Sequence, residues 1–298
     1  MNLASHLTVS RLSARQVYER ARQCRLFVCD LDGTLLDKYG RIDRETLSAV
    51  QQLQGQGVSL VLATGRMDRS ARVFWRQLNL HTPIISCNGA MIRMPGSEEL
   101  LYSQPLPAEA LQALAGYLDA QQIDVLIYDA AQVFYRRGSQ RIRFFERYNI
   151  QARSCGMPEV PTCTYTSLTD LLLAHAEPFY KLFAAYLTPE QETYLRAMST
   201  EKQGLSAQAS ALRSLDIMAS GQSKGEGLLK VAELLQIDPA RTAAAGDQEN
   251  DIAMFKVAGL SICMKNGTDP ARQAADVIWE DHAAAGIGRG IQQYFIKR

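Results

Sequence analysis

Residues 27–37 read FVCDLDGTLLD, an apolar run that ends in two aspartates one position apart. The overlapping stretch 25–29, RLFVC, is too short for a helix and predicts a buried strand. Asp30 and Asp32 therefore follow the carboxyl end of a strand, and Gly33 permits a sharp turn directly after them. Carboxylates two positions apart on an extended chain project to the same side, so a positive charge is expected between them.

Strands and helices alternate on both sides of a long interruption. Before it, the pattern predicts strands at 25–29, 58–63 and 83–86 and helices at 44–54, capped by Asp43, and at 68–78. After it, the pattern predicts strands at 214–220, 241–247, 260–264 and 276–279 and helices near 223–236 and 249–258. Strands joined by crossover helices are typical of an α/β fold with a Rossmann-like parallel sheet.

The interruption, residues 91–213, alternates less regularly. It contains strand-like stretches at 123–129, 132–137 and 179–187 and helical stretches near 107–120 and 189–199. We therefore expect an α+β domain at 91–213, inserted into a core formed by residues 24–90 and 214–298.

Residues 1–23 form an N-terminal extension rich in arginine. The arginines recur at helical spacing around Leu12 and Val17, which favours a solvated helix. A single acid, Glu19, is also compatible with a mitochondrial transit peptide, the alternative interpretation.

Composition excludes several classes of protein. Of 298 residues, 47% are hydrophobic and 21% are charged, with a formal net charge of +1. That balance provides no global attraction to nucleic acid or to an anionic membrane, and no apolar stretch approaches the roughly 20 residues that span a bilayer. The six cysteines and four histidines lack zinc-ligand spacing, so we expect reduced, mostly buried thiols in a cytoplasmic protein.

A calcium loop of the EF-hand type also begins D-x-D. Such a loop requires glycine at its sixth position and glutamate at its twelfth, which are here Leu35 and Arg41. A strand also precedes the motif where a helix belongs. The sequence therefore excludes an EF-hand at this place.

Further polar stretches follow three other predicted strands. They are Thr64-Gly65-Arg66, Lys224 in GQSKGEGL, and GDQEND at 246–251. Because the carboxyl ends of parallel strands lie on one edge of a sheet, these residues should converge with Asp30 and Asp32. Four carboxylates with one ammonium suit a hard divalent cation together with an anion, and Mg²⁺ prefers oxygen ligands.

Four stretches, FVCDLDGTLLD, LVLATGR, GQSKGEGL and GDQEND, occur in this order. Together they resemble the four motifs of the haloacid dehalogenase superfamily of phosphatases. The insertion resembles the large cap of its Cof-like, class IIB branch, of which ISCNGA (85–90), MKNG (264–267) and DPARQAADVI (269–278) are also typical. The resemblance covers about residues 24–298 and implies a parallel-sheet core with an inserted α+β cap.

The resemblance also implies residue roles. Asp30 would be the nucleophile that forms an aspartyl-phosphate, and Asp32 would act as general acid and base. Mg²⁺ would be held by Asp30, the backbone carbonyl of Asp32, Asp247 and Asp251, the last directly or through water. Phosphate would be bound by Thr64, Gly65, Lys224 and Asn250.

The implied substrates are small phosphorylated metabolites: sugar phosphates, or cofactor phosphates such as pyridoxal phosphate and FMN. No nucleic-acid or membrane partner is implied, and the oligomeric state stays open. A phosphosugar mutase of the phosphomannomutase type and a phosphate sensor without turnover are the alternatives. Cap residues that could meet a polar substrate, although solvated faces explain them equally well, are Tyr128, Tyr135, Arg136, Arg137, Arg141, Arg143 and Lys181.

Overall fold

The computed structural model describes residues 11–211 and 213–296. The chain divides into two compact units. The first contains the chain up to Thr64, Phe74–Pro83, and the chain from Lys224 onward, and the second contains Gly65–Val73 and Ile84–Ser223.

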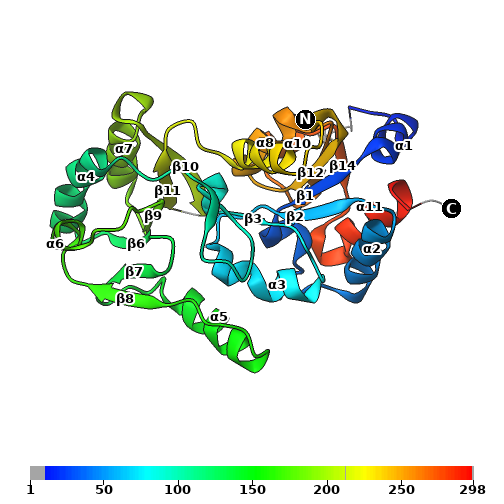
Figure 1. Cartoon of the computed structure of the whole chain (residues 1–298). Coiled ribbons are helices and arrows are strands. Elements are labelled where there is room, and N and C mark those ends of the chain that lie inside the picture. The colour runs from blue at the N-terminus through cyan, green and yellow to red at the C-terminus, as the bar shows by residue number, and fades with distance from the viewer. Residues whose placement is uncertain (1–10, 212, 297–298) are drawn as a thin grey trace, which may run out of the picture. The chain divides into compact units, whose positions relative to one another are not determined.

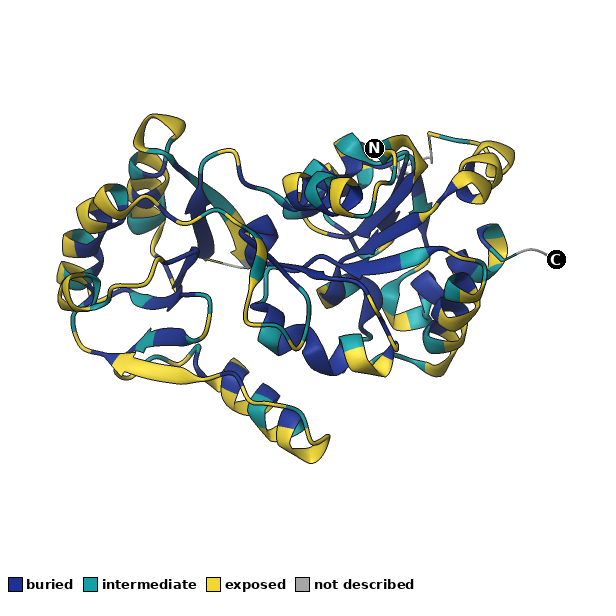
Figure 2. Ribbon diagram, viewed as in Figure 1, coloured by how far each residue is buried: buried dark blue, intermediate teal, exposed yellow. Residues whose placement is uncertain are grey.

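The first unit is built on a parallel sheet with strand order β14-β13-β12-β1-β2. Its strands are β1 (Leu26–Cys29), β2 (Ser59–Leu62), β12 (Thr242–Gly246), β13 (Leu260–Met264) and β14 (Val277–Trp279). β1 lies between β12 and β2, with Leu26 opposite Thr242 and Ser59. Its four residues are all buried, as the apolar run predicts for a central strand covered on both faces (Figure 2).

Helices cover both faces of this sheet. They are α1 (Ala14–Gln23), α2 (Arg44–Gly55), α8 (Lys224–Leu234), α9 (Ile252–Val257), α10 (Asp269–Ala274) and α11 (Gly286–Tyr294). Figure 1 shows α2 and α11 on one face and α8 and α10 on the other. The α/β fold predicted from the sequence is confirmed.

The starts of two helices follow from their capping residues. The Asp43 carboxylate accepts the backbone N–H of Thr46 at 2.8 Å and begins α2 where the sequence predicts it. Ser13 caps α1, whose Val17 and Ala21 are buried. The helix expected within 1–23 is thus present at 14–23, and residues 1–10 of that prediction lie outside the described part of the chain.

The second unit contains two sheets. The larger has strand order β10-β11-β9-β6-β7-β8 and the smaller β3-β4-β5. The strands are β3 (Ile84–Ser86), β4 (Met91–Arg93), β5 (Leu100–Ser103), β6 (Asp124–Tyr128), β7 (Val133–Arg136), β8 (Thr162–Tyr165), β9 (Lys181–Ala185), β10 (Leu205–Ala211) and β11 (Ser214–Ala219). The helices of this unit are α4 (Ala108–Ala120), α5 (Arg143–Ser154), α6 (Leu168–Ala174) and α7 (Pro189–Met198), while α3 (Arg72–Gln77) contains residues of both units.

Two strands expected in the core sheet lie elsewhere. β11 pairs antiparallel with β10 and with β9, so the strand at 214–220 belongs to the large sheet of the second unit. β3 pairs antiparallel with β4 and not with the parallel sheet. Both runs are apolar and strand-forming, but the choice of a pairing partner depends on residues distant in sequence. The prediction was right about the strands and wrong about their sheet.

The described helices include none that is long and apolar enough to cross a membrane. The six cysteines are free thiols, of which Cys24, Cys29, Cys87 and Cys263 are buried and Cys155 and Cys163 are exposed. Burial raises the pKa of Cys24 and of Cys87 to about 12. Free and mostly buried thiols, as the sequence predicts, are therefore present.

Candidate active site

Asp30 lies at the carboxyl end of the central strand of the core sheet. Its backbone N–H donates to the carbonyl of Ala245 on β12, and its side chain is buried. The chain then turns through Gly33, which has φ +81°. A Cβ at Gly33 would lie 2.4 Å from Oδ2 of Asp247, so both the backbone conformation and the close carboxylate require glycine here.

Asp247 follows β12, the parallel neighbour of β1. Its Oδ1 accepts the hydroxyl of Thr34 at 2.9 Å, and its Oδ2 accepts the side-chain amide of Gln248 at 2.8 Å. Thr34 belongs to the turn that contains Gly33, so this bond ties the FVCDLDGTLLD and GDQEND stretches together. The predicted convergence of these two strand ends is present in the structure.

Asp251 is the fourth residue after Asp247 and is fully buried. Its Oδ2 accepts the backbone N–H groups of Asp247 and Gln248, each at 2.9 Å. A Cβ at Gly246 would lie 2.3 Å from Cγ of Asp251, which explains the glycine that begins GDQEND. Asp251 thereby fixes the loop that presents Asp247.

Lys224 is the first residue of α8 and is 1% exposed. Its Nζ donates to Oδ1 of Asp30 at 2.6 Å and to Oδ1 of Asp251 at 2.7 Å. Burial alone would lower the pKa of Lys224, but the two carboxylates outweigh it and hold the pKa above its usual range. The lysine is therefore charged and bridges two of the acidic stretches.

Asp30, Asp247 and Asp251 offer ligand oxygens that lie within 4.8 Å of one another. Burial raises the pKa of Asp30 well above its usual range, and the charges of Asp251 and Asp247 add to that rise against the opposing effect of Lys224. Burial and then the Asp251 charge raise the pKa of Asp247 to about 6. Three buried carboxylates against one ammonium leave an excess of negative charge that a divalent cation would neutralise. The all-oxygen donor set fits Mg²⁺.

The remaining predicted residues of the core lie near these groups in the chain. Asp32 is exposed and lies in the turn after Asp30, outside the group of buried carboxylates. Thr64 is buried two residues after the end of β2. Asn250 is half-buried in the short turn Glu249–Asp251. Gly65 belongs to the second unit.

Asn266 supports the turn that contains Gly33, a role that sequence reasoning missed. Its Nδ2 donates to the carbonyl of Gly33 at 2.8 Å, and its Oδ1 accepts the backbone N–H of His282 at 3.1 Å. The ring Nδ1 of His282 lies 2.7 Å from the carbonyl of Leu36, at the end of the same turn. The available signal was MKNG at 264–267, which the sequence links to the family without giving Asn266 a function.

Several of the candidate cap residues are engaged inside the second unit. Arg136 is buried and forms an ion pair with Asp119 at 2.6 Å, and Lys181 and Tyr128 are also buried. A solvated face therefore does not explain these three residues. Arg137 and Arg143 are exposed, and Tyr135 and Arg141 are half-buried.

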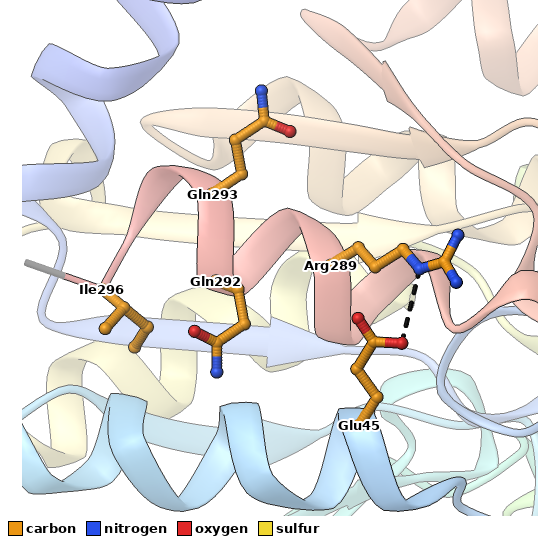
Figure 3. Close-up of a pocket in the computed structure, with 5 residues that line it drawn as sticks. All are labelled: Glu45, Arg289, Gln292, Gln293 and Ile296. Carbon is orange, nitrogen blue, oxygen red and sulfur yellow. Dashed lines mark hydrogen bonds and ion pairs between the residues drawn. The ribbon is translucent and has the colours of Figure 1, made fainter. Parts of the chain in front are cut away.

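A groove of about 470 Å³ lies between α2 and α11 (Figure 3). It is lined by Glu45, Arg289, Gln292, Gln293 and Ile296. None of its lining residues belongs to the acidic group of Asp30, Asp247 and Asp251. Its ion pair, between Arg289 and Glu45 at 3.4 Å, has both side chains about half exposed. An exposed ion pair of this kind contributes little to the free energy of folding. We assign the groove no part in the chemistry.

Comparisons with known proteins match most of the chain. The family model of the haloacid dehalogenase-like hydrolases matches residues 27–291. The chain is 26% identical to the 5-amino-6-(5-phospho-D-ribitylamino)uracil phosphatase YitU of Bacillus subtilis, over 91% of this chain and 97% of that one. It is also 26% identical to the pyridoxal phosphate phosphatase YbhA of Escherichia coli, over 91% and 99%. A solved haloacid dehalogenase-like hydrolase from B. subtilis has a TM-score of 0.78 at 22% identity, with coverage of 90% and 99%.

Proposed function

Because the chain belongs to the haloacid dehalogenase-like hydrolases, we propose that it is a Mg²⁺-dependent phosphatase of small phosphomonoesters with Asp30 as its nucleophile. The observation that carries this proposal is the buried carboxylate of Asp30, 2.6 Å from the ammonium of Lys224 and grouped with Asp247 and Asp251. The resemblance of the four motifs to this family, inferred from the sequence, is confirmed by the family match.

The reaction requires two displacements at phosphorus. A carboxylate oxygen of Asp30 bonds to phosphorus as the bond to the leaving oxygen breaks, and Asp32 gives its proton to that oxygen. Water then attacks phosphorus and gives a proton to Asp32, while the bond between Asp30 and phosphorus breaks and inorganic phosphate leaves. Asp32 is exposed, so it is accessible to the leaving group and to water.

Asp30 needs positively charged neighbours because both it and the substrate carry negative charge. A phosphate dianion is repelled by a carboxylate, and Lys224 lies where it can offset this repulsion. When bound, Mg²⁺ would neutralise further negative charge on the phosphoryl group and keep Asp30 ionised. Asp30, Asp247 and the main-chain carbonyl of Asp32 would hold the ion.

Asp251 is better suited to orient these groups than to bind the ion directly. Its two oxygens already accept two backbone N–H groups and the Lys224 ammonium. Thr64 and the backbone of Gly65 would bind phosphate oxygens together with Asn250. These last assignments follow from the family motifs that the residues match.

The substrate class follows from the names of the relatives. Two relatives of similar length are named as phosphatases, one of a phosphorylated ribitylamino-uracil and one of pyridoxal phosphate. We therefore propose small phosphorylated metabolites, with cofactor and sugar phosphates as the first to test. A phosphomannomutase-type mutase would pass the phosphoryl group to a second sugar hydroxyl, and a silent sensor would not need Asp32.

The test is phosphate release from a panel of phosphomonoesters, with Mg²⁺ and with EDTA. Asp30→Asn should lower kcat by about 10⁴-fold or more, because the nucleophile is lost. Asp30→Ala is the second variant, because the asparagine of the first can deamidate to aspartate and restore the nucleophile. Glu233→Gln, at an exposed acid on α8, is the matched control. Phosphate release by folded Asp30→Ala at the wild-type rate would overturn the assignment. Transfer to sugar without release would favour the mutase.

A further inference from the structure

Lys181 is buried in the second unit, and its ammonium contacts a carboxylate and a backbone carbonyl. It begins β9, is 4% exposed, and forms an ion pair with Oδ1 of Asp216 on β11 at 2.8 Å. Oδ2 of Asp216 accepts Nδ2 of Asn88 at 2.8 Å, and both of these residues are 1% exposed. We call these three residues, Lys181, Asp216 and Asn88, the buried triad.

The buried triad contacts the backbone that directly follows Thr64. Lys181 Nζ donates to the carbonyl of Gly65 at 2.8 Å. The next carbonyl, of Arg66, accepts the backbone N–H of Cys87 at 2.8 Å. A Cβ at Gly65 would lie 3.0 Å from Oδ1 of Asn88, so the glycine allows this close approach. The backbone of Gly65 and Arg66 is thus held at two successive carbonyls.

Stability alone is a weak explanation for this arrangement. A buried ion pair costs desolvation free energy, and well-packed apolar residues of similar volume often stabilise a fold as well or better. Lys181 also lies within 6 Å of the ring centroids of Tyr128 and Phe183, so apolar material surrounds it already. The carbonyl of Gly65 is the partner that an apolar replacement could not hold.

We propose that Lys181, oriented by Asp216 and Asn88, is a positioning residue for the Thr64–Gly65 turn. The inference rests on the proposed phosphatase function, in which that turn binds the phosphoryl group. Lys181 holds the carbonyl of Gly65, and the backbone of Gly65 is bonded directly to Thr64. Since the phosphoryl group is common to all substrates, the effect of Lys181 is independent of the leaving group.

The experiment compares wild type with Lys181→Met and Lys181→Arg, and uses Lys202→Met, at an exposed lysine of the same unit, as the matched control. We would measure kcat and KM for p-nitrophenyl phosphate and pyridoxal 5′-phosphate, and inhibition by orthovanadate. Lys181→Met should lower kcat/KM by about 10- to 100-fold, by the same factor for both substrates. Orthovanadate inhibition should weaken in parallel, and Lys181→Arg should recover part of the loss.

A second readout does not depend on activity. Hydrogen exchange of a peptide that covers residues 63–70 should be faster in Lys181→Met than in wild type, while peptides from β6 and β7 keep their protection. If wild type releases no phosphate, the proposed function fails, and this exchange measurement still decides whether Lys181 holds the turn. If Lys181→Met does not fold, Asp216→Asn, which keeps the volume, is judged by the same criteria with an expected loss of about tenfold.

Two results would overturn the inference. One is unchanged exchange at 63–70 in a folded variant. The other is a loss of kcat/KM that differs by more than tenfold between the two substrates, because that would make Lys181 a contact for the leaving group.

Discussion

Each compact unit buries a lysine against carboxylates, but the charge balance around the two lysines differs. In the first unit, Lys224 contacts Asp30 and Asp251, and Asp247 lies close to both. In the second, Lys181 forms an ion pair with Asp216 and donates to the backbone carbonyl of Gly65. The first site keeps an excess of negative charge and the second is balanced.

The difference separates a site whose charge a cation would balance from one whose charges already balance. Excess buried carboxylate charge is unfavourable for stability, as the raised pKa values of Asp30 and Asp247 indicate. Such an arrangement fits the Mg²⁺ site proposed above. A balanced pair needs no further charge, so the function of Lys181 lies in the geometry of what it holds. Removal of each lysine should therefore have different consequences.

The largest effect is expected from Lys224→Met. Loss of the ammonium should lower kcat by about 10³-fold, because no other described cation contacts Asp30. In metal-free protein at pH 7.5 it should also lower the free energy of unfolding by about 3 to 5 kcal/mol, since the carboxylates lose their partner. Both are measured by phosphate release and by urea titration.

The same variant has a diagnostic pH dependence. At pH 5 the destabilisation should shrink, because Asp247, with a pKa of about 6, is then largely protonated. Equal losses at both pH values in Lys224→Met would contradict the part assigned to Asp247.

Asp247 should make metal-free protein less stable as the pH rises. Its pKa is about 6 in the folded chain and about 3.8 in the unfolded chain, so the folded state binds more protons between these values. The free energy of unfolding should therefore fall between pH 4 and pH 6, by on the order of 3 kcal/mol from this group. Asp247→Asn should flatten that fall.

Mg²⁺ provides the complementary measurement. It should raise the melting temperature of wild type strongly at pH 7.5 and weakly at pH 5, where protons compete for the carboxylates. Asp247→Asn should lose most of this increase. An increase of equal size in wild type and in the variant would place the ion elsewhere.

A smaller effect of pH on stability, opposite in sign to that of Asp247, is expected from Asp119 in the second unit. Burial would raise the pKa of Asp119, but the backbone N–H groups of Thr169 and Leu168, the Thr169 hydroxyl and Arg136 lower it to about 2. Its stabilisation is fully present above about pH 4 and is lost as the pH falls toward 2. Asp119→Asn should lower the stability of this unit at pH 7 by about 1 to 3 kcal/mol and flatten the acid-side loss. Hydrogen exchange in α6 would report it.

Much of the site could be predicted because its residues lie next to strand ends. Asp30 and Asp247 each follow a short apolar strand, and the carboxyl ends of parallel strands share an edge, so their convergence needed only the order of elements. Asn266 could not be assigned in the same way. Its contact with Gly33 joins residues that are 233 positions apart, and an asparagine in a turn has many local explanations.

The sequence by itself determined the α/β class, the four motifs in their order and the candidate site residues, because these depend on local patterns and chain order. Only the tertiary structure decided that β3 and β11 leave the parallel sheet and that Lys181 contacts Gly65. Strand partners and buried ion pairs join segments far apart in sequence, and their free energy depends on which groups exclude water together. A periodic pattern within a short stretch of sequence does not predict which distant segments pair.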